Sequence, residues 1–404
     1  MTLDNLVFDG PVKRMTDQDL YKFSMSNAYM RKFPCAEGVF EFCDRNHEKC
    51  FTDPEMFSAL KRAFASLSTL KLTDEEFNWC KTNIPYIPAS YWEWLRQFRY
   101  DPEKIVAWVD DEGHLQIHVA DNLYKVTLYE VPILAIVSEI RNSHLYKWNR
   151  QAVIDNIRKK IDFANAHNLK FAEFGTRRRY NYEVQEIVVE HLANECRLNC
   201  TGTSNVFLAM KYNMKPIGTM AHEWIMFHGG VFGFQQANYL ALENWTDVYD
   251  GDLGTALIDT YGTDSFLETL TMKQAKLLDG FRQDSGDPTI IGNKIIKRLK
   301  EFGIDPKTKL IIFSNALTMD SYNDINTYFD RKIIVGAGIG GHLTNDMPDI
   351  PDYVAPNIVM KLMKVRLSPQ FPYSNTIKLS DDKGKTMGDP EIVNYCKKIL
   401  NIKD

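Results

Sequence analysis

The chain has 404 residues, of which 44% are hydrophobic and 25% charged, so it contains enough apolar material for a large core and two domains. A formal net charge of −5 excludes a global attraction to nucleic acid, and we expect a small ligand held by a local site. The longest apolar run, 131–137, is far shorter than the roughly 20 residues of a membrane span, and the start MTLDNLVFDG lacks a signal-peptide core. The seven cysteines include no Cys-x-x-Cys pair, which argues against a disulfide framework or a structural zinc site. These features predict a cytoplasmic protein with no membrane partner.

The first 138 residues have the pattern of a mixed α+β domain. A helix is expected over residues 17–33, followed by the strand-like run GVFEF and by helical segments rich in Phe and Trp up to about residue 98. Two alternating runs in KIVAWVDDEGHLQIHV flank the turn residues 111–113, which predicts a β-hairpin.

From about residue 165 onward, short apolar runs alternate with helical segments. One such segment carries Val184, Val188 and Leu192 on one helical face and charges on the other. The strand-like runs are KFAEFG, RLNCTG, KPIGT, GTALIDTYG, DGFRQ, KLIIFSN and RKIIVGAG. Strands joined by helical crossovers in this way predict a parallel sheet.

Each of these runs ends in glycine or a polar residue. Active-site groups of a (β/α) barrel lie at the carboxyl ends of its strands, with contributions from several strands, which matches this distribution. We therefore predict an α/β fold with an irregular (β/α) barrel over residues 139–355 and an N-terminal α+β domain over residues 1–138. The tail 356–404 contains IVMKLMKV and NTIKLSDDKGK, which we expect to form strands that pack back on the first domain.

The run GAGIGG, residues 336–341, has the Gly-x-Gly-x-x-Gly spacing of a dinucleotide site. Prolines in the following HLTNDMPDIPDYVAP argue against the long helix that this motif needs. The glycines instead suit a phosphate cradle, because backbone N–H groups approach an anion closely where no Cβ intervenes. A tight turn without a ligand is the alternative.

The run FRQDSGDP places two opposite charges at a strand end. Arg282 and Asp284 are two residues apart and therefore share a face, with one suited to phosphate oxygens and the other to sugar hydroxyls or Mg²⁺. Asp287, directly before Pro288, suits the N-cap of the following helix.

The run FAEFGTRRRY ends in three consecutive arginines. Arg177 lies nearest the strand end, where its planar guanidinium suits an anionic group held through two hydrogen bonds. Arg178 and Arg179 fit either such a role or a solvated face.

His222 in GTMAHEW lies at an expected helix start. The next histidine, His228, is six residues on and rotated by about 240° on a helix, which argues against a metal site built on this pair. A buried structural histidine is one interpretation. At a phosphate-binding barrel mouth, the neutral imidazole, with Glu223 beside it, could instead accept a phosphoryl group from ATP as a nucleophile.

Over nearly its whole length the chain resembles nicotinate phosphoribosyltransferase, a type II phosphoribosyltransferase. The resemblance rests on seven ordered motifs, TDQDLYKFSM, FAEFGTRRR, GTSNV, GTMAHEW, FRQDSGDP, FSNAL and GAGIGGHLTND. It implies that nicotinate and 5-phosphoribosyl 1-diphosphate become nicotinate mononucleotide and diphosphate in NAD salvage, coupled to ATP hydrolysis. It also implies a homodimer whose active site combines the barrel of one subunit with the N-terminal domain of the other.

The resemblance further implies roles for single residues, with His222 as the autophosphorylated histidine. By the same resemblance, Tyr21 of the neighbouring subunit and Phe174 flank the pyridine ring, Arg177 and Thr219 lie near nicotinate, Arg282 and Asp284 contact ribose and phosphates, and Gly338, Gly340 and Gly341 cradle the 5-phosphate. Near relatives that use nicotinamide carry an Asp after the Gly-Thr of the second barrel strand. Ser204 stands there in this chain, and the missing carboxylate favours the acid substrate.

Displacement of diphosphate from C1 of ribose builds positive charge on the sugar, which carboxylates stabilise. Asp284 and Asp259 are the candidates for that role, while Mg²⁺ and Arg282 neutralise the leaving diphosphate. Nicotinamide and quinolinate phosphoribosyltransferases are the alternatives within this class. A sugar-phosphate lyase would need a Schiff-base lysine at a strand end, which these runs do not supply, and a ligand-binding barrel without activity leaves His222 unexplained.

Overall fold

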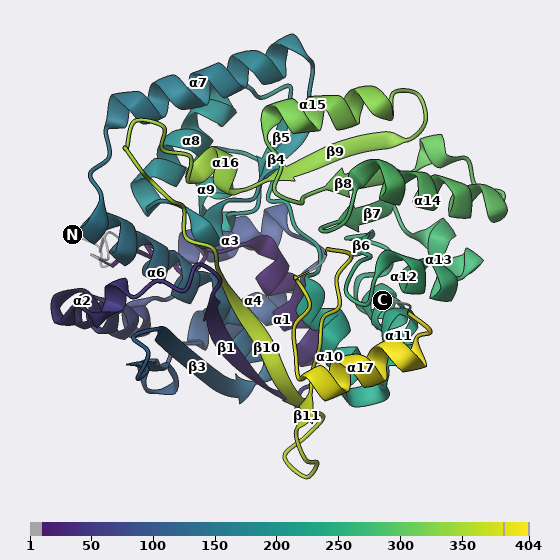
Figure 1. Ribbon diagram of the computed structural model, residues 1–404, viewed down its shortest axis with the longest axis horizontal. Helices are drawn as coiled ribbons and strands as arrows, with labels where there is room; N and C mark the ends of the chain where they lie inside the picture. The colour runs from purple at the N-terminus through teal and green to yellow at the C-terminus, as the bar shows by residue number, and fades with distance from the viewer. Residues whose placement is uncertain (1–9, 383, 403–404) are drawn as a thin grey trace.

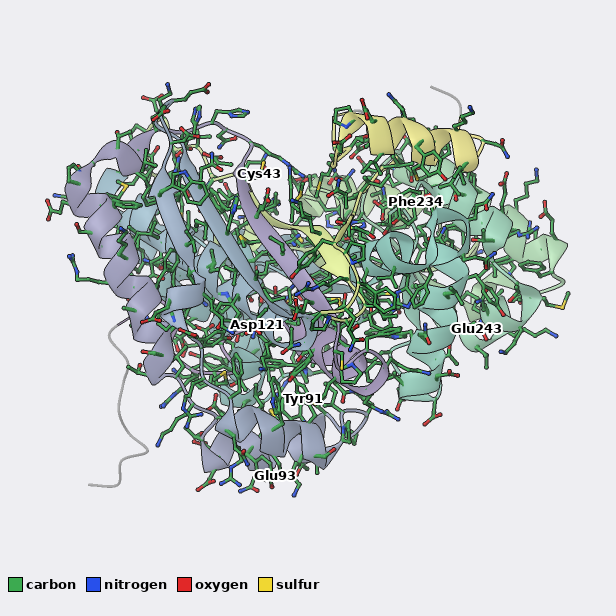
Figure 2. The ribbon with its side chains drawn as sticks, turned by 90° about the horizontal axis from the view of Figure 1, so that it is seen from below. Cys43, Tyr91, Glu93, Asp121, Phe234 and Glu243 are labelled. Carbon is green, nitrogen blue, oxygen red and sulfur yellow. The ribbon has the colours of Figure 1, made fainter. Side chains whose placement is uncertain are left out.

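Two β-sheets organise the computed structural model, which describes residues 10–382 and 384–402 (Figure 1). One sheet is antiparallel, with strand order β11-β10-β1-β3-β2, and the other is parallel, with strand order β5-β4-β9-β8-β7-β6. In Figure 2, Cys43 and Asp121 mark strands β1 and β3 of the antiparallel sheet, and Phe234 and Glu243 mark helix α11 on the other side of the view. Most of MTLDNLVFDG, in which we find no signal-peptide pattern, lies outside the described residues.

The antiparallel sheet contains the hairpin expected from KIVAWVDDEGHLQIHV. Its strands are β1 (Glu37–Asp44), β2 (Val106–Val109), β3 (Leu115–Asn122), β10 (Ile358–Arg366) and β11 (Ser374–Asn375). Strands β2 and β3 pair with Ala107 opposite Ile117, which confirms the hairpin. Alternate residues of β1, among them Phe40 and Phe42, are buried, so one face of the sheet covers the core.

Local signals explain where the helices of the first part begin. These helices are α1 (Leu20–Lys32), α2 (Pro54–Ser66), α3 (Asp74–Asn83), α4 (Ala89–Gln97), α5 (Leu123–Val126) and α6 (Glu130–Leu145). The Asp53 carboxylate accepts hydrogen bonds from the first turn of α2, and Thr73 and Glu76 form a capping box for α3. No helix within the described ranges combines the length and the apolar stretch that spanning a membrane requires.

The parallel sheet is built from the short apolar runs predicted to be strands. Its strands are β4 (Phe171–Glu173), β5 (Cys200–Thr203), β6 (Thr255–Leu257), β7 (Gly280–Gln283), β8 (Leu310–Phe313) and β9 (Ile334–Ile339). The helices that follow in the chain are α7 (Arg150–Ala166), α8 (Tyr182–Glu195), α9 (Val206–Lys211), α10 (His222–Phe232), α11 (Phe234–Tyr249), α12 (Thr263–Thr269), α13 (Met272–Leu277), α14 (Pro288–Glu301), α15 (Met319–Tyr328), α16 (Gly341–Thr344) and α17 (Pro390–Ile399). Val184, Val188 and Leu192 are buried on α8, as the helical periodicity predicts.

The run KPIGT differs from the expectation, because it forms a single parallel bridge between Pro216 and Thr203 in place of a strand. Proline has no N–H to donate, so a continuous ladder cannot form there. Ile217 N–H donates to the Thr203 carbonyl (2.9 Å), and the Thr219 hydroxyl donates to the Thr255 carbonyl (3.0 Å). These contacts join β5 to β6 and close the sheet into an irregular barrel, which confirms the predicted fold class.

The C-terminal tail divides between the two sheets. Strand β10 pairs with β1, as expected for IVMKLMKV, and the two lie side by side in Figure 1. The strand expected from NTIKLSDDKGK is wrong for most of its length, because Leu379 N–H donates to the Thr260 carbonyl (2.8 Å) and Asp382 accepts from Gly286 N–H (2.8 Å). This part of the tail therefore contacts the loops that follow β6 and β7. The domain boundaries stay a prediction.

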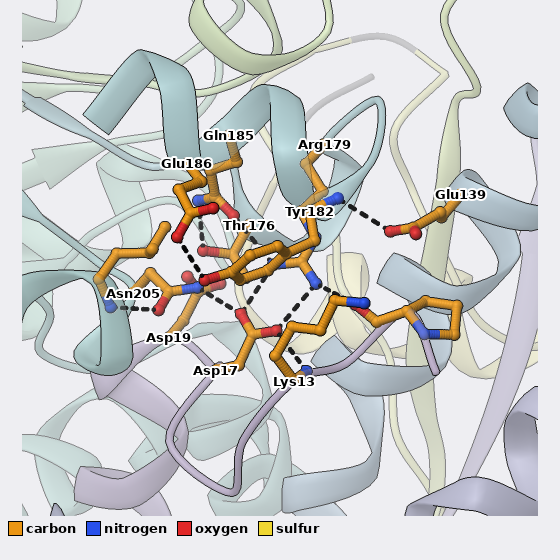
Figure 3. Close-up of polar contacts among 12 residues, drawn as sticks. Lys13, Asp17, Asp19, Glu139, Thr176, Arg179, Tyr182, Gln185, Glu186 and Asn205 are labelled. Carbon is orange, nitrogen blue, oxygen red and sulfur yellow. Dashed lines mark hydrogen bonds and ion pairs between the residues drawn. The ribbon is translucent and has the colours of Figure 1, made fainter. Parts of the chain in front are cut away.

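A fully buried ion pair joins the segment before α1 to the barrel (Figure 3). The Arg179 guanidinium donates to both carboxylate oxygens of Asp17, at 2.7 and 3.0 Å, and Asn205 donates to the same carboxylate (2.8 Å). Burial opposes the charge of Asp17, but Arg179 outweighs it, and the pKa of Asp17 lies below its usual value. The solvated-face interpretation is therefore wrong for Arg179, which is completely buried, and Arg178 is half-buried.

Replacing Asp17 by Asn should lower the free energy of unfolding by about 3 kcal/mol, because Arg179 would remain buried without its counter-charge. Urea denaturation of wild type and variant measures the difference. The matched control is Asp53→Asn at the start of α2, where Asn caps a helix as well as Asp, so we expect a change below about 0.5 kcal/mol. Equal losses in the two variants would contradict the importance of the ion pair.

Candidate functional site

His222 is the first residue of α10 and lies at the carboxyl ends of the parallel strands, which we call the rim. Its Nδ1 is 2.9 Å from Thr260 Oγ1, and its Nε2 is 3.1 Å from Asp284 Oδ2. Thr260 follows β6 and Asp284 follows β7, and these strands are neighbours in the sheet. The imidazole is thus held at both ring nitrogens between two strand ends.

The charges around His222 favour an ionised Asp284 and a neutral imidazole. Burial and the nearby charge of Lys378 lower the pKa of His222, although Asp259 and Asp284 act in the opposite direction. Burial also opposes the ionisation of Asp284. The hydrogen bond with His222 and the charges of Arg282 and Lys378 outweigh that effect, so the pKa of Asp284 lies well below its usual value.

Arg282 and Asp259 belong to the same rim. Arg282, in β7, donates from Nη1 to the carbonyl of Met220 (3.1 Å), two residues before His222. Asp259 Oδ2 is 4.0 Å from His222 Nε2 and accepts from Ser285 Oγ (2.5 Å). Asp259 Oδ1 and Arg282 Nε are buried and have no hydrogen-bond partner in the described part of the chain. Buried polar atoms are normally paired, so these two suit contacts with a ligand.

Lys378 is a rim residue that the pattern of strand ends did not predict. It lies in the C-terminal tail, is 7% exposed, and carries a charge that acts on His222, Asp259 and Asp284. Burial lowers the pKa of Lys378, and the two carboxylates oppose this. The hydrogen bond from Leu379 to the barrel holds the backbone next to it. No local pattern distinguishes this lysine from the other lysines of the tail.

Tyr21 reaches the rim of its own barrel. Ser24 Oγ, one turn further along α1, donates to the Thr219 carbonyl (2.6 Å). Tyr21 itself lies against Gly218, where an added Cβ would be 2.9 Å from the Tyr21 nitrogen. The Tyr21 hydroxyl is buried, with no hydrogen-bond partner among the residues described. Helix α1 thus packs on the barrel of the same chain, and the contribution of Tyr21 from a neighbouring subunit stays a prediction.

Ser204 forms a hydrogen bond with the carboxylate of Asp19, so a carboxylate lies beside position 204 although the sequence has none at that position. Its hydroxyl donates to Asp19 Oδ1 (2.6 Å), and its carbonyl accepts from Leu20 N–H (2.8 Å). Burial raises the pKa of Asp19, while hydrogen bonds from Ser204 and Thr176 and the charge of Arg177 act against the shift. Selectivity for the acid therefore depends on more than Ser204, because Asp19 comes from a distant segment and the charge of Arg177 offsets that of Asp19.

Phe174 packs against Gly338 of β9 and against Gly340, which follows that strand. A Cβ on Gly338 would lie 2.3 Å from a carbon of the Phe174 ring, and a Cβ on Gly340 would lie 3.0 Å from the Phe174 carbonyl. Gly338 therefore makes room for Phe174, and its role in a phosphate cradle stays a prediction. Gly341 has open space around the position of a Cβ, so an anion could approach its backbone.

Arg177 and Glu223 meet in a second group of charges. Glu223 turns from His222 to Lys22, with Oε2 2.5 Å from Lys22 Nζ, so the structure does not bring its carboxylate to the histidine. Arg177 is 37% exposed in its side chain, and its Nη1 lies 3.6 Å from Glu130 Oε1. The guanidinium is the member of this group that is open to a ligand.

Family models match both parts of the chain. The model for the nicotinate phosphoribosyltransferase (NAPRTase) family matches residues 169–404, and the model for the NAPRTase N-terminal domain matches residues 16–138. The chain belongs to the nicotinate phosphoribosyltransferase family. A nicotinate phosphoribosyltransferase of Chromohalobacter salexigens is 40% identical over 388 residues, covering 96% of this chain and 97% of that protein. One of Methanosarcina mazei is 34% identical, covering 97% of this chain and 99% of that protein.

Solved structures of the family have the same fold. The crystal structure of nicotinate phosphoribosyltransferase from Porphyromonas gingivalis superposes with a TM-score of 0.94 at 39% identity, covering 96% of this chain and 99% of that one. The family member from Vibrio cholerae gives a TM-score of 0.92 at 30% identity, covering 98% and 96%. Both comparisons span the antiparallel sheet and the barrel together.

Glu173, the last residue of β4, is a titratable group close to the rim of this family member. It is fully buried, and it accepts hydrogen bonds from Thr203 Oγ1 and Gly175 N–H, both at 2.5 Å. Burial raises the pKa of Glu173 from 4.5 to about 7, although these hydrogen bonds oppose the shift. The folded state therefore binds this proton more tightly than the unfolded chain. The contribution of Glu173 to stability falls as the pH rises from about 4.5 to about 7.

Glu173→Gln should remove this pH dependence. Between pH 5 and pH 8 we expect the wild type to lose about 2.5 kcal/mol more free energy of unfolding than the variant. Urea denaturation at both pH values measures the two slopes, with Glu301→Gln at the exposed end of α14 as the control that should match the wild type. Identical slopes for wild type and Glu173→Gln would show that Glu173 does not titrate in this range.

Proposed function

We propose that this chain transfers phosphoribosyl from 5-phosphoribosyl 1-diphosphate to nicotinate, and that ATP hydrolysis drives the transfer through a phosphohistidine at His222. Membership of the family supports the transfer reaction. The observation that carries the coupling is the imidazole held between Thr260 and Asp284 at a rim that also contains Arg282 and Lys378.

The hydrogen bonds of His222 support one tautomer. An ionised carboxylate can only accept, so Nε2 carries the proton that faces Asp284. Nδ1 then holds the free electron pair and accepts from the Thr260 hydroxyl. On this reasoning, Nδ1 is the nucleophilic atom.

In the first step, Nδ1 of His222 attacks the γ-phosphorus of ATP, an N–P bond forms, and the bond to the bridging oxygen breaks to release ADP. The Thr260 hydroxyl turns away from Nδ1 to make room. The proton stays on Nε2, which donates it in a hydrogen bond to the Asp284 carboxylate. This carboxylate offsets the positive charge that develops on the ring, as in a catalytic triad. Arg282 and Lys378 supply positive charge to the phosphoryl oxygens.

In the second step, the bond between C1 of ribose and diphosphate breaks as the pyridine nitrogen bonds to C1. Water then cleaves the N–P bond of the phosphohistidine, which releases inorganic phosphate and restores the free imidazole. Asp284 and Asp259 lie near enough to His222 to stabilise the positive charge on the sugar. Mg²⁺ would arrive with the diphosphate as part of the substrate and neutralise its charge. The unpartnered Asp259 Oδ1 is an oxygen donor that suits it. In the described residues, no group of three or more His, Cys, Asp or Glu side chains is arranged to hold a metal ion.

Nicotinate recognition is assigned to the residues around α1 and β4. Arg177 would bind the carboxylate through its exposed guanidinium, with the rings of Tyr21 and Phe174 beside the pyridine and Thr219 close by. Tyr21 of the same chain lies with its backbone against Gly218, next to Thr219, while the ring beside the pyridine is proposed to come from Tyr21 of a neighbouring subunit. The homodimer and the cytoplasmic location are kept as proposals that rest on the sequence.

Incubation with γ-labelled ATP and Mg²⁺ should give an acid-labile protein phosphate that nicotinate and 5-phosphoribosyl 1-diphosphate discharge. His222→Asn should lose the label and the ATPase activity but keep slow, ATP-independent transfer. Lys378→Met should lower the rate of labelling about 100-fold, because a cation at the developing phosphoryl charge is lost. Lys364→Met, at an exposed residue of β10, is the matched control and should label normally. Undiminished stimulation by ATP in His222→Asn would refute the coupling.

Ser204→Asp should shift the preference from nicotinate toward nicotinamide. The new carboxylate would lie beside Asp19, repel the acid, and lower kcat/KM for nicotinate about 30-fold. Ser204→Asn keeps the size without the charge and should have a much smaller effect. Product analysis with nicotinate, nicotinamide and quinolinate checks both variants. A wild type that prefers either of the last two pyridines would establish the alternative function.

A further inference from the structure

Four charged side chains form one group beside the rim: Lys22, Glu130, Glu223 and Arg177, which we call the Lys22 cluster. Lys22 is fully buried and makes ion pairs with both carboxylates, with Nζ 2.5 Å from Glu223 Oε2. Glu130 Oε1 lies 3.6 Å from Arg177 Nη1. Glu130 therefore stands between two cations and contacts Lys22 more closely than Arg177.

The Lys22 cluster is balanced, with two cations and two carboxylates from four separate elements: α1, α6, the turn after β4 and α10. The Thr127 hydroxyl donates to Glu223 (2.5 Å). The Lys22 ammonium also lies 5.6 Å from the centre of the Phe40 ring. These surroundings exclude water. If one charge is removed, its partner remains buried without a counter-ion, which is unfavourable and favours pairing with another group of opposite charge.

Arg177 is the member of the cluster that a ligand can reach. Its distance to Glu130 exceeds that of a hydrogen bond, so its N–H groups are available to a carboxylate from outside. Burial opposes its charge, but the surrounding acids raise its pKa above the usual value; these groups are Tyr21, Glu130, Asp284 and Asp19. Arg177 therefore stays positively charged. Whether it pairs with Glu130 or with a ligand depends on how far Lys22 already neutralises the Glu130 carboxylate.

We propose that Lys22 is a positioning residue for nicotinate, because by neutralising Glu130 it leaves Arg177 free to bind the carboxylate of the substrate. This inference rests on the proposed function, in which Arg177 contacts nicotinate. Without Lys22, Glu130 draws Arg177 into a direct ion pair, and nicotinate loses its partner. Glu223 competes with Glu130 for the Lys22 ammonium, so it reduces the extent to which Lys22 neutralises Glu130.

Two double variants with equal charge changes test the proposal. Lys22→Met/Glu130→Gln and Lys22→Met/Glu223→Gln each remove one cation and one carboxylate, so both keep the Lys22 cluster balanced. Lys22→Met/Glu223→Gln retains Glu130 and should raise the KM for nicotinate about 30-fold, which corresponds to the loss of one charge-assisted ion pair between Arg177 and the substrate. Lys22→Met/Glu130→Gln lacks Glu130 and should keep the KM for nicotinate within about threefold of wild type. In both, the KM for 5-phosphoribosyl 1-diphosphate should change less than about twofold.

Equal KM values for nicotinate in the two double variants would overturn the role of Lys22. Glu130→Gln is a milder variant, since Lys22 remains paired with Glu223, and it should also keep the KM for nicotinate within about threefold of wild type. A large increase there would mean that Glu130 itself holds Arg177 in place, and this too would overturn the proposal. Arg177→Ala separates the two ways of failing, because an unchanged KM for nicotinate in that variant would contradict the proposed function of Arg177.

Discussion

The ion pair between Asp17 and Arg179 is the contact on which the arrangement of the rim depends. It lies in the interior and touches no group that we assign to a substrate, yet it anchors the chain directly before α1 to the barrel. Breaking a buried ion pair of this kind leaves an uncompensated charge in the interior, which disfavours arrangements in which the two residues are apart. With this anchor in place, Asp19, Tyr21 and Lys22 follow at their positions beside the strand ends.

The sequence predicted the part of the site that depends on local patterns. Apolar runs followed by polar residues identify strand ends, and the carboxyl ends of parallel strands share one edge, so the meeting of His222 with Arg282 and Asp284 follows from strand direction. From the sequence alone, a glycine in a strand run fits either an anion-binding backbone or a position where a neighbouring side chain needs room. The sequence predicts Gly338 to be part of an anion cradle, and only the position of the Phe174 ring shows that its missing Cβ also serves packing.

The remaining partners depend on contacts between distant segments. Ser204 and Asp19 are 185 residues apart, and Lys22 and Glu223 are 201 residues apart, so no periodicity or motif joins them. Lys378 enters from a tail that we expected to stay with the antiparallel sheet. In each case the missed feature is a charge whose partner lies on another element, and composition and spacing carry no information about such pairings.

The packing of Phe174 on Gly338 has a consequence for the whole family. The ring occupies the space that any side chain at 338 would need, and the two residues belong to segments joined by the hydrogen bond from Phe174 N–H to the Ile339 carbonyl (2.8 Å). A methyl group at 338 can therefore be accommodated only if the residue at 174 is smaller or its ring is tilted. A relative with a side chain at the position of Gly338 in β9 should therefore carry a smaller residue at the position of Phe174, which directly follows β4, whereas a smaller residue at 174 remains compatible with glycine at 338.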